Sequence, residues 1–212
     1  MKVKICKVDG CENEAITFPN STIKGKYCKD HAISQAVAKV RLIKVKSAKK
    51  ERTQKTDELM SVDQYRSKYV QPIINEIARL IDYCQPCIAT GLMSGKMSGG
   101  HYFSVGSNRT ICLNLHNIHV QSFHSNSAMG GDNIRYRQGI INTYGNEYMK
   151  LIESLKRTDP VKLTKDDLKQ IKAKASEIRN TLKKNLKIRT PVERMKIREL
   201  INEQIGIYES LY

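Results

Sequence analysis

Three cysteines and one histidine near the N-terminus restrict the fold of this chain more than any other feature of its sequence. The four residues follow the pattern C-x4-C-x16-C-x2-H and are Cys6, Cys11, Cys28 and His31. Thiolates and an imidazole form the tetrahedral shell that zinc prefers, and ligands paired at short spacing close that shell at low entropic cost. Residues 1–35 hold few core-forming side chains, so a segment of this size needs such a cross-link to fold. We therefore predict one structural zinc ion; the alternative is four scattered residues that never meet.

Charge defines the class of partner. The 212 residues carry a formal net charge of +16, and a surface this basic favours polyanions because each neutralised phosphate releases counterions. Nucleic acid is favoured over a membrane surface, since no basic segment carries a bulky aromatic face. The N-terminus has no apolar leader and no run approaches the roughly 18 apolar residues of a membrane span. We expect an intracellular protein whose cysteines are metal ligands or buried thiols and not disulfides.

The pattern along the chain predicts an α+β protein in four segments. These are a zinc-binding knuckle at 1–35, a basic helical linker at 36–60, a core at 61–150 and basic C-terminal helices at 151–212. Between Lys39 and Thr56 the linker holds eight Lys or Arg and a single Glu51. Such a run is either a solvated helix or an arm that contacts phosphate, and the two readings are compatible. We expect DNA contacts from Lys44, Lys46, Lys49 and Lys50.

Apolar spacing and capping residues predict helices on both sides of a loop-rich centre. Ser61 is a predicted N-cap, Pro72 is expected to kink or delay the helix that follows, Thr164 with Asp167 forms a predicted capping box, and Thr190 precedes a last helix. Residues 88–131 are rich in Gly, Ser and Asn. Within them we predict short strands at 101–105 (HYFSV) and 109–113 (RTICL), in a region where binding groups tend to lie.

Residues 99–126 hold four of the five histidines of the chain, namely His101, His116, His119 and His124. Histidine and asparagine together can supply a general base and neutral ligands for a hard divalent ion. Hydrolysis of a phosphodiester needs both, because water must be deprotonated and the developing negative charge stabilised. A loop that is merely rich in histidine remains the alternative on these residues alone.

The order of the motifs is more specific than the histidine count. "GHY", then "NIH-x-Q", then an Asn seven residues after "IH" resembles the NinG, or Rap, family of phage recombination nucleases, which is related to the HNH, or ββα-metal, nucleases. The N-terminal Cys/His knuckle, the basic helix, the stretches 86–91 and 131–137, and the helix LTKDDLKQIKAK also fit this resemblance. Only the tail after about residue 185 lacks a counterpart.

The resemblance implies a zinc knuckle, a ββα-metal (HNH-like) core and long basic helical arms. It further implies a Mg²⁺- or Mn²⁺-dependent endonuclease that acts on branched DNA, such as Holliday junctions or D-loops, in the cytoplasm of an infected bacterial host. No membrane and no small-molecule cofactor are expected. The catalytic residues carried over are His101 as the base, Asn117 as the residue that shapes the loop, and His119. Those carried over for the catalytic metal ion are Asn126 and Asp132.

The chain departs from the family pattern in its cysteines and its acids. A second zinc site is usual in the family, yet the matching positions here are Cys87, Thr90, Ser122 and Ser125. Because three of four ligands are absent together, we expect hydrogen bonds and packing to hold this region; a site from Cys84, Cys87 and His124 is the alternative. The family also often has an Asp where this chain has Asn114, and no Asp stands directly before His101, where residues 99–101 read GGH.

These departures keep two other functions open. The first is a catalytically silent DNA-binding protein that assists recombination, and the second is a virion-associated protein. A homodimer is plausible in the nuclease case, because a four-way junction is two-fold symmetric and its useful cleavage takes paired nicks.

Overall fold

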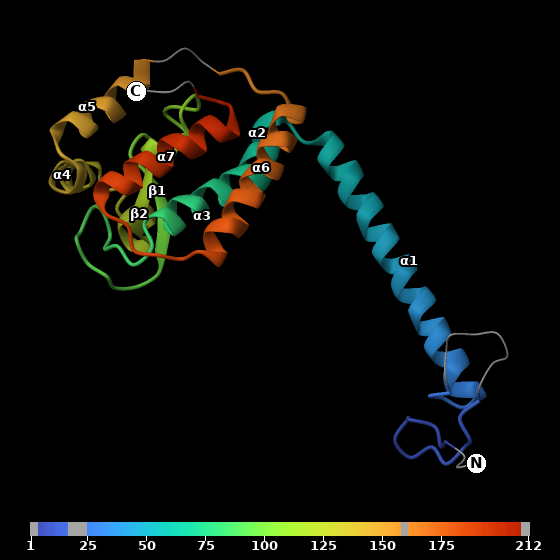
Figure 1. Ribbon diagram of the computed structural model, residues 1–212. Helices are drawn as coiled ribbons and strands as arrows, with labels where there is room; N and C mark the ends of the chain where they lie inside the picture. The colour runs from blue at the N-terminus through green and yellow to red at the C-terminus, as the bar shows by residue number, and fades with distance from the viewer. Residues whose placement is uncertain (1–3, 17–24, 158–160, 209–212) are drawn as a thin grey trace. The chain divides into compact units, whose positions relative to one another are not determined.

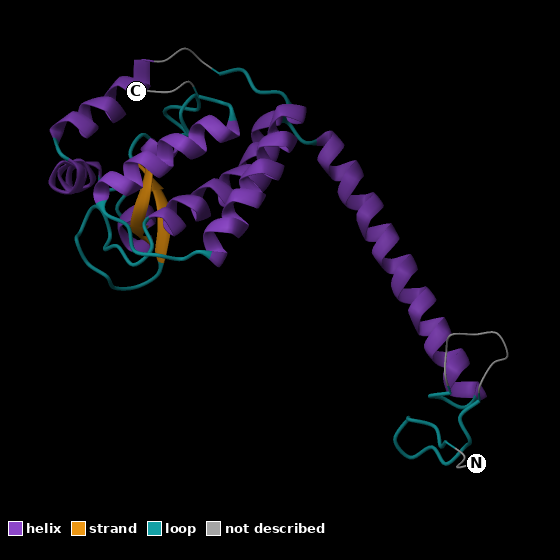
Figure 2. Ribbon diagram, viewed as in Figure 1, coloured by secondary structure: helices purple, strands orange, loops and turns teal. Residues whose placement is uncertain are grey.

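The computed structural model describes residues 4–16, 25–157 and 161–208, and the chain divides into two compact units. The N-terminal unit is Met1–Leu59 and the C-terminal unit is Met60–Tyr212. Apart from Met60, the first two predicted segments fall in the former and the last two in the latter. The α+β class is confirmed, since the described chain is mostly helical with one two-stranded sheet (Figures 1 and 2). None of the described helices is both long and apolar enough to cross a bilayer.

The N-terminal unit consists of short turns followed by one long helix. A single β-bridge joins Ile5 to Glu14. Helix α1 (Lys29–Leu59) begins directly after Cys28, whose carbonyl accepts the backbone N–H of Ala32 at 2.8 Å. None of the residues of α1 is buried. The helix therefore presents its basic side chains to solvent along its length, and its N-terminus is fixed to the cysteine cluster.

The C-terminal unit opens with three consecutive helical segments, α2 (Val62–Tyr65), η1 (Arg66–Val70) and α3 (Gln71–Ile81). Ser61 is the predicted N-cap and forms a capping box with Gln64. Segment η1 is a π-helical turn, and Pro72 follows it in the first turn of α3. Proline lacks an N–H and clashes with the preceding turn of an α-helix, so a widened turn before Pro72 relieves both problems.

The sheet pairs β1 (Met97–His101) with β2 (Ile118–Ser122) in antiparallel register, with His101 opposite Ile118. The strands predicted at 101–105 and 109–113 were therefore wrong. Glycine is a poor strand former, but close packing requires Gly99 and Gly100 in this strand. A Cβ on Gly99 would lie 2.7 Å from the backbone oxygen of Asn75 in α3, and one on Gly100 would lie 1.9 Å from Oε1 of Gln121.

Two helices enclose the sheet. Since side chains alternate between the faces of a strand, Gly99 and Gly100 face opposite sides. Gly99 meets α3, while the carbonyl of Gly100 accepts the hydroxyl of Tyr136 in α4 (Asn133–Tyr144) at 3.0 Å. Helix α5 (Asn146–Ser154) follows α4 after Gly145, whose positive φ of 89° suits glycine, and is continued by η4 (Leu155–Arg157).

The last two helices belong to the core and are not projecting arms. Helix α6 (Lys165–Lys184) has the predicted Thr164–Asp167 capping box, and α7 (Pro191–Ile205) starts after Thr190 as predicted. Their apolar faces pack with α3 and β2 in one hydrophobic cluster, to which they contribute Leu168, Ile171, Ala175, Leu182, Ile201 and Ile205. Burial of this apolar stripe is what holds both helices against the unit.

Candidate functional site

The four N-terminal ligand candidates lie together in the structure. One ligand atom each from Cys6, Cys11, Cys28 and His31 falls within 4.8 Å of the others. The Sγ atoms of Cys11 and Cys28 are 3.8 Å apart, and Nδ1 of His31 lies 3.4 Å from Sγ of Cys6 and 3.3 Å from Sγ of Cys28. Zn–S bonds of about 2.3 Å in a tetrahedron place neighbouring sulfurs about 3.8 Å apart. The cluster can hold one metal ion such as zinc, with all four positions filled by protein.

We expect one tightly bound zinc ion per chain. Metal analysis after exhaustive dialysis should give about one equivalent for the wild type, because a closed four-ligand site exchanges slowly. Cys28→Ser should bring the content close to zero. Cys84→Ser, which removes an exposed cysteine outside the cluster, is the matched control and should retain the ion. Two equivalents, one of which survives Cys28→Ser, would contradict this assignment.

His101 ends β1, and its ring is held by a carbonyl. Its Nε2 lies 3.0 Å from the carbonyl oxygen of Cys112 and 3.1 Å from Nε2 of Gln71. A carbonyl can only accept, so Nε2 carries the hydrogen and Nδ1 has the lone pair. In the part of the chain that the structure describes, no hydrogen bond occupies Nδ1. Burial lowers the pKa of His101 below its ordinary 6.5, against the Cys112 carbonyl, which raises it. The ring is therefore neutral at pH 7, as a general base requires.

Asn117 closes the connection between the two strands. Its Oδ1 accepts the backbone N–H of Phe103 at 2.8 Å, and its Nδ2 donates to the carbonyl of Phe103 at 3.0 Å. The carbonyl of Asn117 in turn accepts the N–H of Tyr102 at 3.0 Å. These bonds fix the two residues that follow His101.

His119 is fully buried and has structural contacts. Its Nδ1 lies 3.1 Å from the hydroxyl of Tyr136, and its ring packs against Tyr136, Tyr144 and Tyr148. Burial lowers its pKa well below 6.5. A side chain without solvent access cannot touch a substrate, so we assign the predicted catalytic residue His119 to the support of β2. His116 is equally buried, bonded to Glu199 and Tyr148 at 2.8 Å each, and burial lowers its pKa to about 4.

Asn126 and Asp132 lie in the segment between β2 and α4. Asn126 belongs to η3 (His124–Ala128), and its Nδ2 donates to Oγ of Ser98 at 3.2 Å, which leaves Oδ1 available as a ligand. Asp132 stands at the N-cap position of α4, but its side chain makes no capping hydrogen bond. Its buried Oδ2 accepts no hydrogen bond from the described residues and has Arg135 at 3.7 Å as an ionic partner. A buried carboxylate oxygen in this state is what an absent cation or water would satisfy.

The structure does not bring the predicted base and metal ligands into direct contact. Ser98, which bonds Asn126, is three residues from His101 on β1, so the two side chains leave opposite faces of the strand. Roughly 10 Å of strand separates them. No hydrogen bond joins His101 to Asn126 or Asp132 among the described residues. A single phosphate group is smaller than this separation, so His101 and an ion held by Asn126 would act on the same phosphate only after one of the two segments moved.

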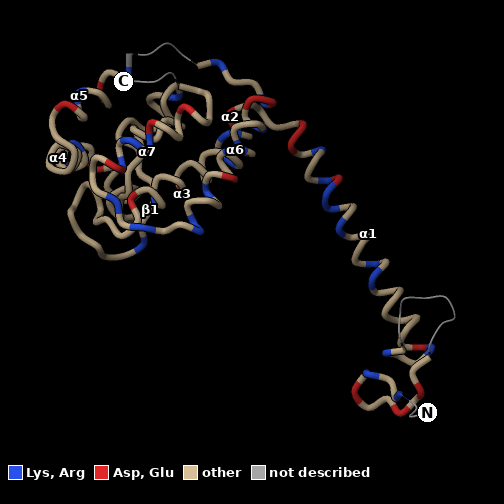
Figure 3. The backbone as a smooth tube through the Cα atoms, in the orientation of Figure 1, with Lys and Arg blue, Asp and Glu red and all other residues tan. Residues whose placement is uncertain are grey.

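The four lysines predicted to contact DNA are exposed on α1. Lys44 is the central residue of α1, and Lys46, Lys49 and Lys50 follow it along a stretch rich in basic side chains (Figure 3). No carboxylate of α1 pairs with any of the four, since the ion pair of this helix joins Lys55 to Glu51 at 3.1 Å. Their charges are available to a polyanion.

Comparison with known proteins decides the family. The model of the family described as "Bacteriophage Lambda NinG protein" matches residues 1–185. The chain belongs to the NinG family. The match ends where the sequence resemblance was expected to end, so α7 of this NinG-family protein lies beyond it.

Curated relatives cover part of the chain. It is 31% identical to "Protein ninG" of Enterobacteria phage H19B over 122 residues, which is 55% of this chain and 60% of that protein. It is also 31% identical to "Protein ninG" of Escherichia phage lambda over 122 residues, which is 55% of this chain and 59% of that protein. "Protein ninG" of Escherichia phage 933W is 32% identical over 111 residues, which is 52% of this chain and 54% of that protein. The chain thus spans 54–60% of the length of these relatives. No solved structure matches it.

Hydrogen bonds join residues at Cys87, Thr90, Ser122 and Ser125, the four positions at which the sequence resemblance implied a second zinc site. Burial raises the pKa of the Cys87 thiol, but bonds from the backbone of Ser122 and from Thr90 more than offset this and the pKa is lowered. The N–H of Ser125 donates to Oγ of Ser122 at 3.2 Å. The alternative site from Cys84, Cys87 and His124 is not formed, because the N-terminal cluster is the only metal-binding group found within the described ranges.

Several residues that organise the site carried no readable signal in the sequence. Gln71 donates from Nε2 to Oδ1 of Asn75 and to the carbonyl of Cys112, the same carbonyl that holds His101. Gln121 donates from Nε2 to Oγ of Ser125 and to the carbonyl of Gly131. Gln121 thereby ties η3 to the start of α4. Its place in "NIH-x-Q" was the one available hint, whereas nothing marks Gln71 in the sequence.

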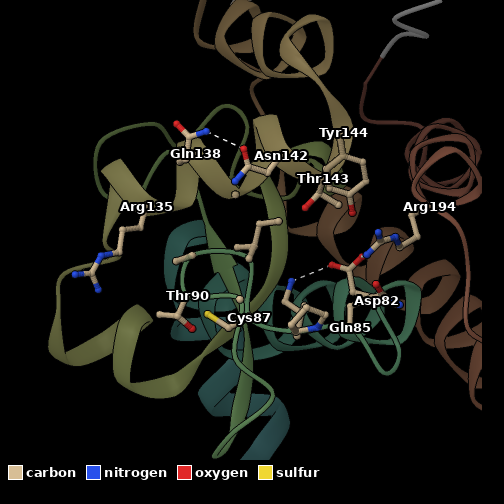
Figure 4. A pocket seen from close by; sticks show the side chains of 16 residues that line it. Asp82, Gln85, Cys87, Thr90, Arg135, Gln138, Asn142, Thr143, Tyr144 and Arg194 are labelled. Atoms are coloured by element: carbon tan, nitrogen blue, oxygen red, sulfur yellow. Dashed lines mark hydrogen bonds and ion pairs between the residues drawn. The ribbon is translucent and has the colours of Figure 1, made fainter.

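A cavity of about 320 Å³ lies between the loop 85–91 and α4 (Figure 4). Its floor includes Asp82, Tyr144 and Arg194, and Arg194 lies over the ring of Tyr144 at 5.0 Å and beside Asp82 at 3.8 Å. Asp82 also accepts the N–H of Val120 at 2.9 Å and pairs with Arg198 at 2.7 Å. The charged groups of Asp82 and Arg194 therefore pair with each other at the edge of the cavity. The same carboxylate supports β2 through Val120.

Proposed function

We propose that this NinG-family protein is a metal-dependent endonuclease that acts on branched DNA. The observation that carries the proposal is the state of His101, a neutral imidazole whose Nε2–H is held by the Cys112 carbonyl and whose Nδ1 carries the lone pair. Histidine in this state is suited to remove a proton from water. The strand–strand–helix order of β1, β2 and α4 is also the order expected of an HNH-like core.

Two side-chain oxygens between β2 and α4 are of the chemical kind that a hard divalent ion binds. Oδ1 of Asn126 and the buried, unbonded Oδ2 of Asp132 are oxygen ligands of the kind that Mg²⁺ and Mn²⁺ accept. Such an ion would stabilise the charge on the phosphate and the leaving oxygen. Two protein oxygens leave most of an octahedral shell to water and phosphate, which is common for Mg²⁺. Asn117 keeps the loop beside His101 in place while His101 takes the proton.

The test is cleavage of a four-way junction and of a D-loop by the wild-type protein with Mg²⁺ or Mn²⁺. Duplex DNA of the same arm sequences is the control. Preferential nicking of the branched substrates supports the proposal. Tight binding without cleavage under either ion, or under Ca²⁺ and Zn²⁺, would instead establish the catalytically silent DNA-binding protein. The virion-associated reading rests on charge alone.

We expect DNA binding to depend on the lysines of α1 and on salt. Reversal of Lys44, Lys46, Lys49 and Lys50 to Glu should weaken junction binding at least about tenfold. It should also reduce the slope of the logarithm of the association constant against the logarithm of the salt concentration. The slope should fall in magnitude by about 0.9 for each phosphate that the variant no longer neutralises. Arginine at the same four positions keeps the charge and should restore both quantities. Titrations over a range of salt concentrations measure this; an unchanged slope, or strong dependence on base sequence, would contradict backbone binding.

Two further features belong to this proposal. A homodimer would present two cleavage centres to the two-fold symmetric junction, and sedimentation with and without junction DNA tests it. A single copy per junction at saturation would refute the dimer without affecting the chemistry. We propose further that the protein acts on DNA in the cytoplasm of an infected bacterial cell.

A further inference from the structure

Phe123 is an aromatic residue that is not part of a hydrophobic core of the described residues. It follows β2 directly, and 53% of it is exposed. Phenylalanine is normally among the most buried residues and contributes a large apolar area to packing. Neither hydrophobic cluster of the described residues includes it. Single exposed apolar residues are common on protein surfaces, and what distinguishes Phe123 is what lies beside it.

The backbone and a lysine hold Phe123 at the end of the sheet. Its N–H donates to the carbonyl of Lys96 at 2.7 Å, one step beyond the paired residues Met97 and Ser122. The ammonium group of Lys96 lies 5.7 Å from the centre of the Phe123 ring. An aromatic face and a positive charge thus occupy the same place and are fixed by main-chain pairing.

The surroundings of this pair suit a nucleic acid strand. Phe123 is three residues, less than one helical turn, from Asn126, the proposed metal ligand. The sequence contains no Asp or Glu between Asp82 and Asp132, so the whole segment that carries the sheet adds no negative charge. Aromatic rings combined with basic groups are how proteins bind single-stranded nucleic acid, with bases stacked on the rings.

We infer that Phe123 stacks on an unpaired base at a DNA branch point, while Lys96 contacts the phosphate backbone of the same strand. This inference rests on the proposed binding of branched DNA and names the residue that recognises the branch. Bases within a duplex are stacked on their neighbours and offer no face to the ring. Phe123 therefore contributes affinity for forked or branched DNA and none for duplex.

The experiment compares Phe123→Ala, Phe123→Tyr and Phe123→Leu on a forked DNA with unpaired bases at the branch and on duplex of equal length. Stacking contributes about 1–3 kcal/mol per base, which corresponds to a loss of about 5- to 150-fold. We expect Phe123→Ala and Phe123→Leu to lose this affinity for the fork, and Phe123→Tyr to keep it. None of the three should change the affinity for duplex DNA. Leu200→Ala removes another exposed apolar residue, 46% exposed on α7, and should change neither affinity.

If Phe123→Leu bound the fork as tightly as the wild type, the contact would be an apolar one without stacking, and this would overturn the inference. Equal losses on fork and duplex would overturn branch recognition. Unfolding of Phe123→Ala at a lower urea concentration than the wild type would assign the ring to the fold instead. These affinities are measured without Mg²⁺ or Mn²⁺. The role of Phe123 would therefore still hold if the wild type bound branched DNA but never cut it, so failure of this inference and failure of the proposed cleavage can be told apart.

Discussion

Asp82→Asn is expected to destabilise the C-terminal unit by about 3–5 kcal/mol, the usual effect of breaking a buried ion pair by removing one partner. The carboxylate is almost completely buried and bonds Arg198, which is itself fully buried, at 2.7 Å. Asparagine keeps the shape and the bond from Val120 but leaves Arg198 and Arg194 without a counter-charge. Burial alone would lower the pKa of Arg198, yet Asp82 together with Tyr144 and Tyr148 more than offsets it and the pKa is raised. Arginine keeps its charge in proteins even without a partner, so the guanidinium of Arg198 is left unpaired in the variant.

Urea unfolding followed by near-ultraviolet circular dichroism measures this loss. The chain has no Trp, and all but one of its ten Tyr, Tyr27, lie in the C-terminal unit. The matched control is Asp166→Asn, because the side chain of Asp166 is 81% exposed and pairs with Lys169, whose side chain is 59% exposed. Surface pairs contribute about 0–1 kcal/mol. Equal effects of the two substitutions would contradict the proposed role of Asp82.

A double variant separates lost charge pairing from lost packing. Replacing Arg198 with Met in the Asp82→Asn background removes the unpaired charge, so its destabilisation should be well below the sum of the two single effects. An additive result would mean that Asp82 and Arg198 stabilise the unit independently. Arg198 would still be needed for the carbonyl of Leu115, which it bonds at 3.1 Å, so complete recovery is not expected.

Features encoded over short stretches of sequence were predictable. The ligand spacing of Cys6, Cys11, Cys28 and His31 indicated one metal centre, and the caps at Ser61, Thr164 and Thr190 marked helix starts correctly. Each depends on residues close in the chain, or on chemistry that admits few alternatives. The family resemblance was predictable for the same reason, since its motifs are short and ordered.

Contacts between distant residues could not be predicted. Arg198 bonds Asp82 across 116 positions, and Glu199 bonds His116 across 83. Nothing in the local sequence distinguishes these buried charges from the exposed ones of a basic helix, so α6 and α7 were expected as arms. The strands were misplaced because Gly99 and Gly100 have low strand propensity. Their need for close packing with Asn75 and Gln121 is visible only in three dimensions.

His101→Ala is expected to lower the rate of junction cleavage by about 10²- to 10⁴-fold, the usual contribution of a general base. Junction affinity should hardly change, and loss of the bond to Cys112 should destabilise the protein by only about 1 kcal/mol. Wild-type cleavage should fall at acidic pH, since protonation removes the lone pair. Because burial lowers the pKa of His101 below 6.5, the rate should already be on its plateau at pH 7.

Two variants distinguish a base from a structural residue. Gln71→Leu disturbs the same hydrogen-bond cluster and leaves the imidazole in place, so its rate should fall much less than that of His101→Ala. Asn126→Ala should be partly rescued by higher Mn²⁺, as expected for a weakened metal site, whereas His101→Ala should not respond to metal. Equal losses for Gln71→Leu and His101→Ala, tracking lost stability, would make His101 a structural residue.

The most direct test of a base at His101 is single-turnover cleavage of a four-way junction in Mn²⁺ by the wild type and by His101→Ala. Both proteins should be present at concentrations that saturate the DNA, so that the ratio of rates reports chemistry and not binding. The expected ratio is about 10² to 10⁴, with equal fractions of junction bound. Equal rates for the two proteins would contradict the assignment of His101 as the base of a NinG-family nuclease.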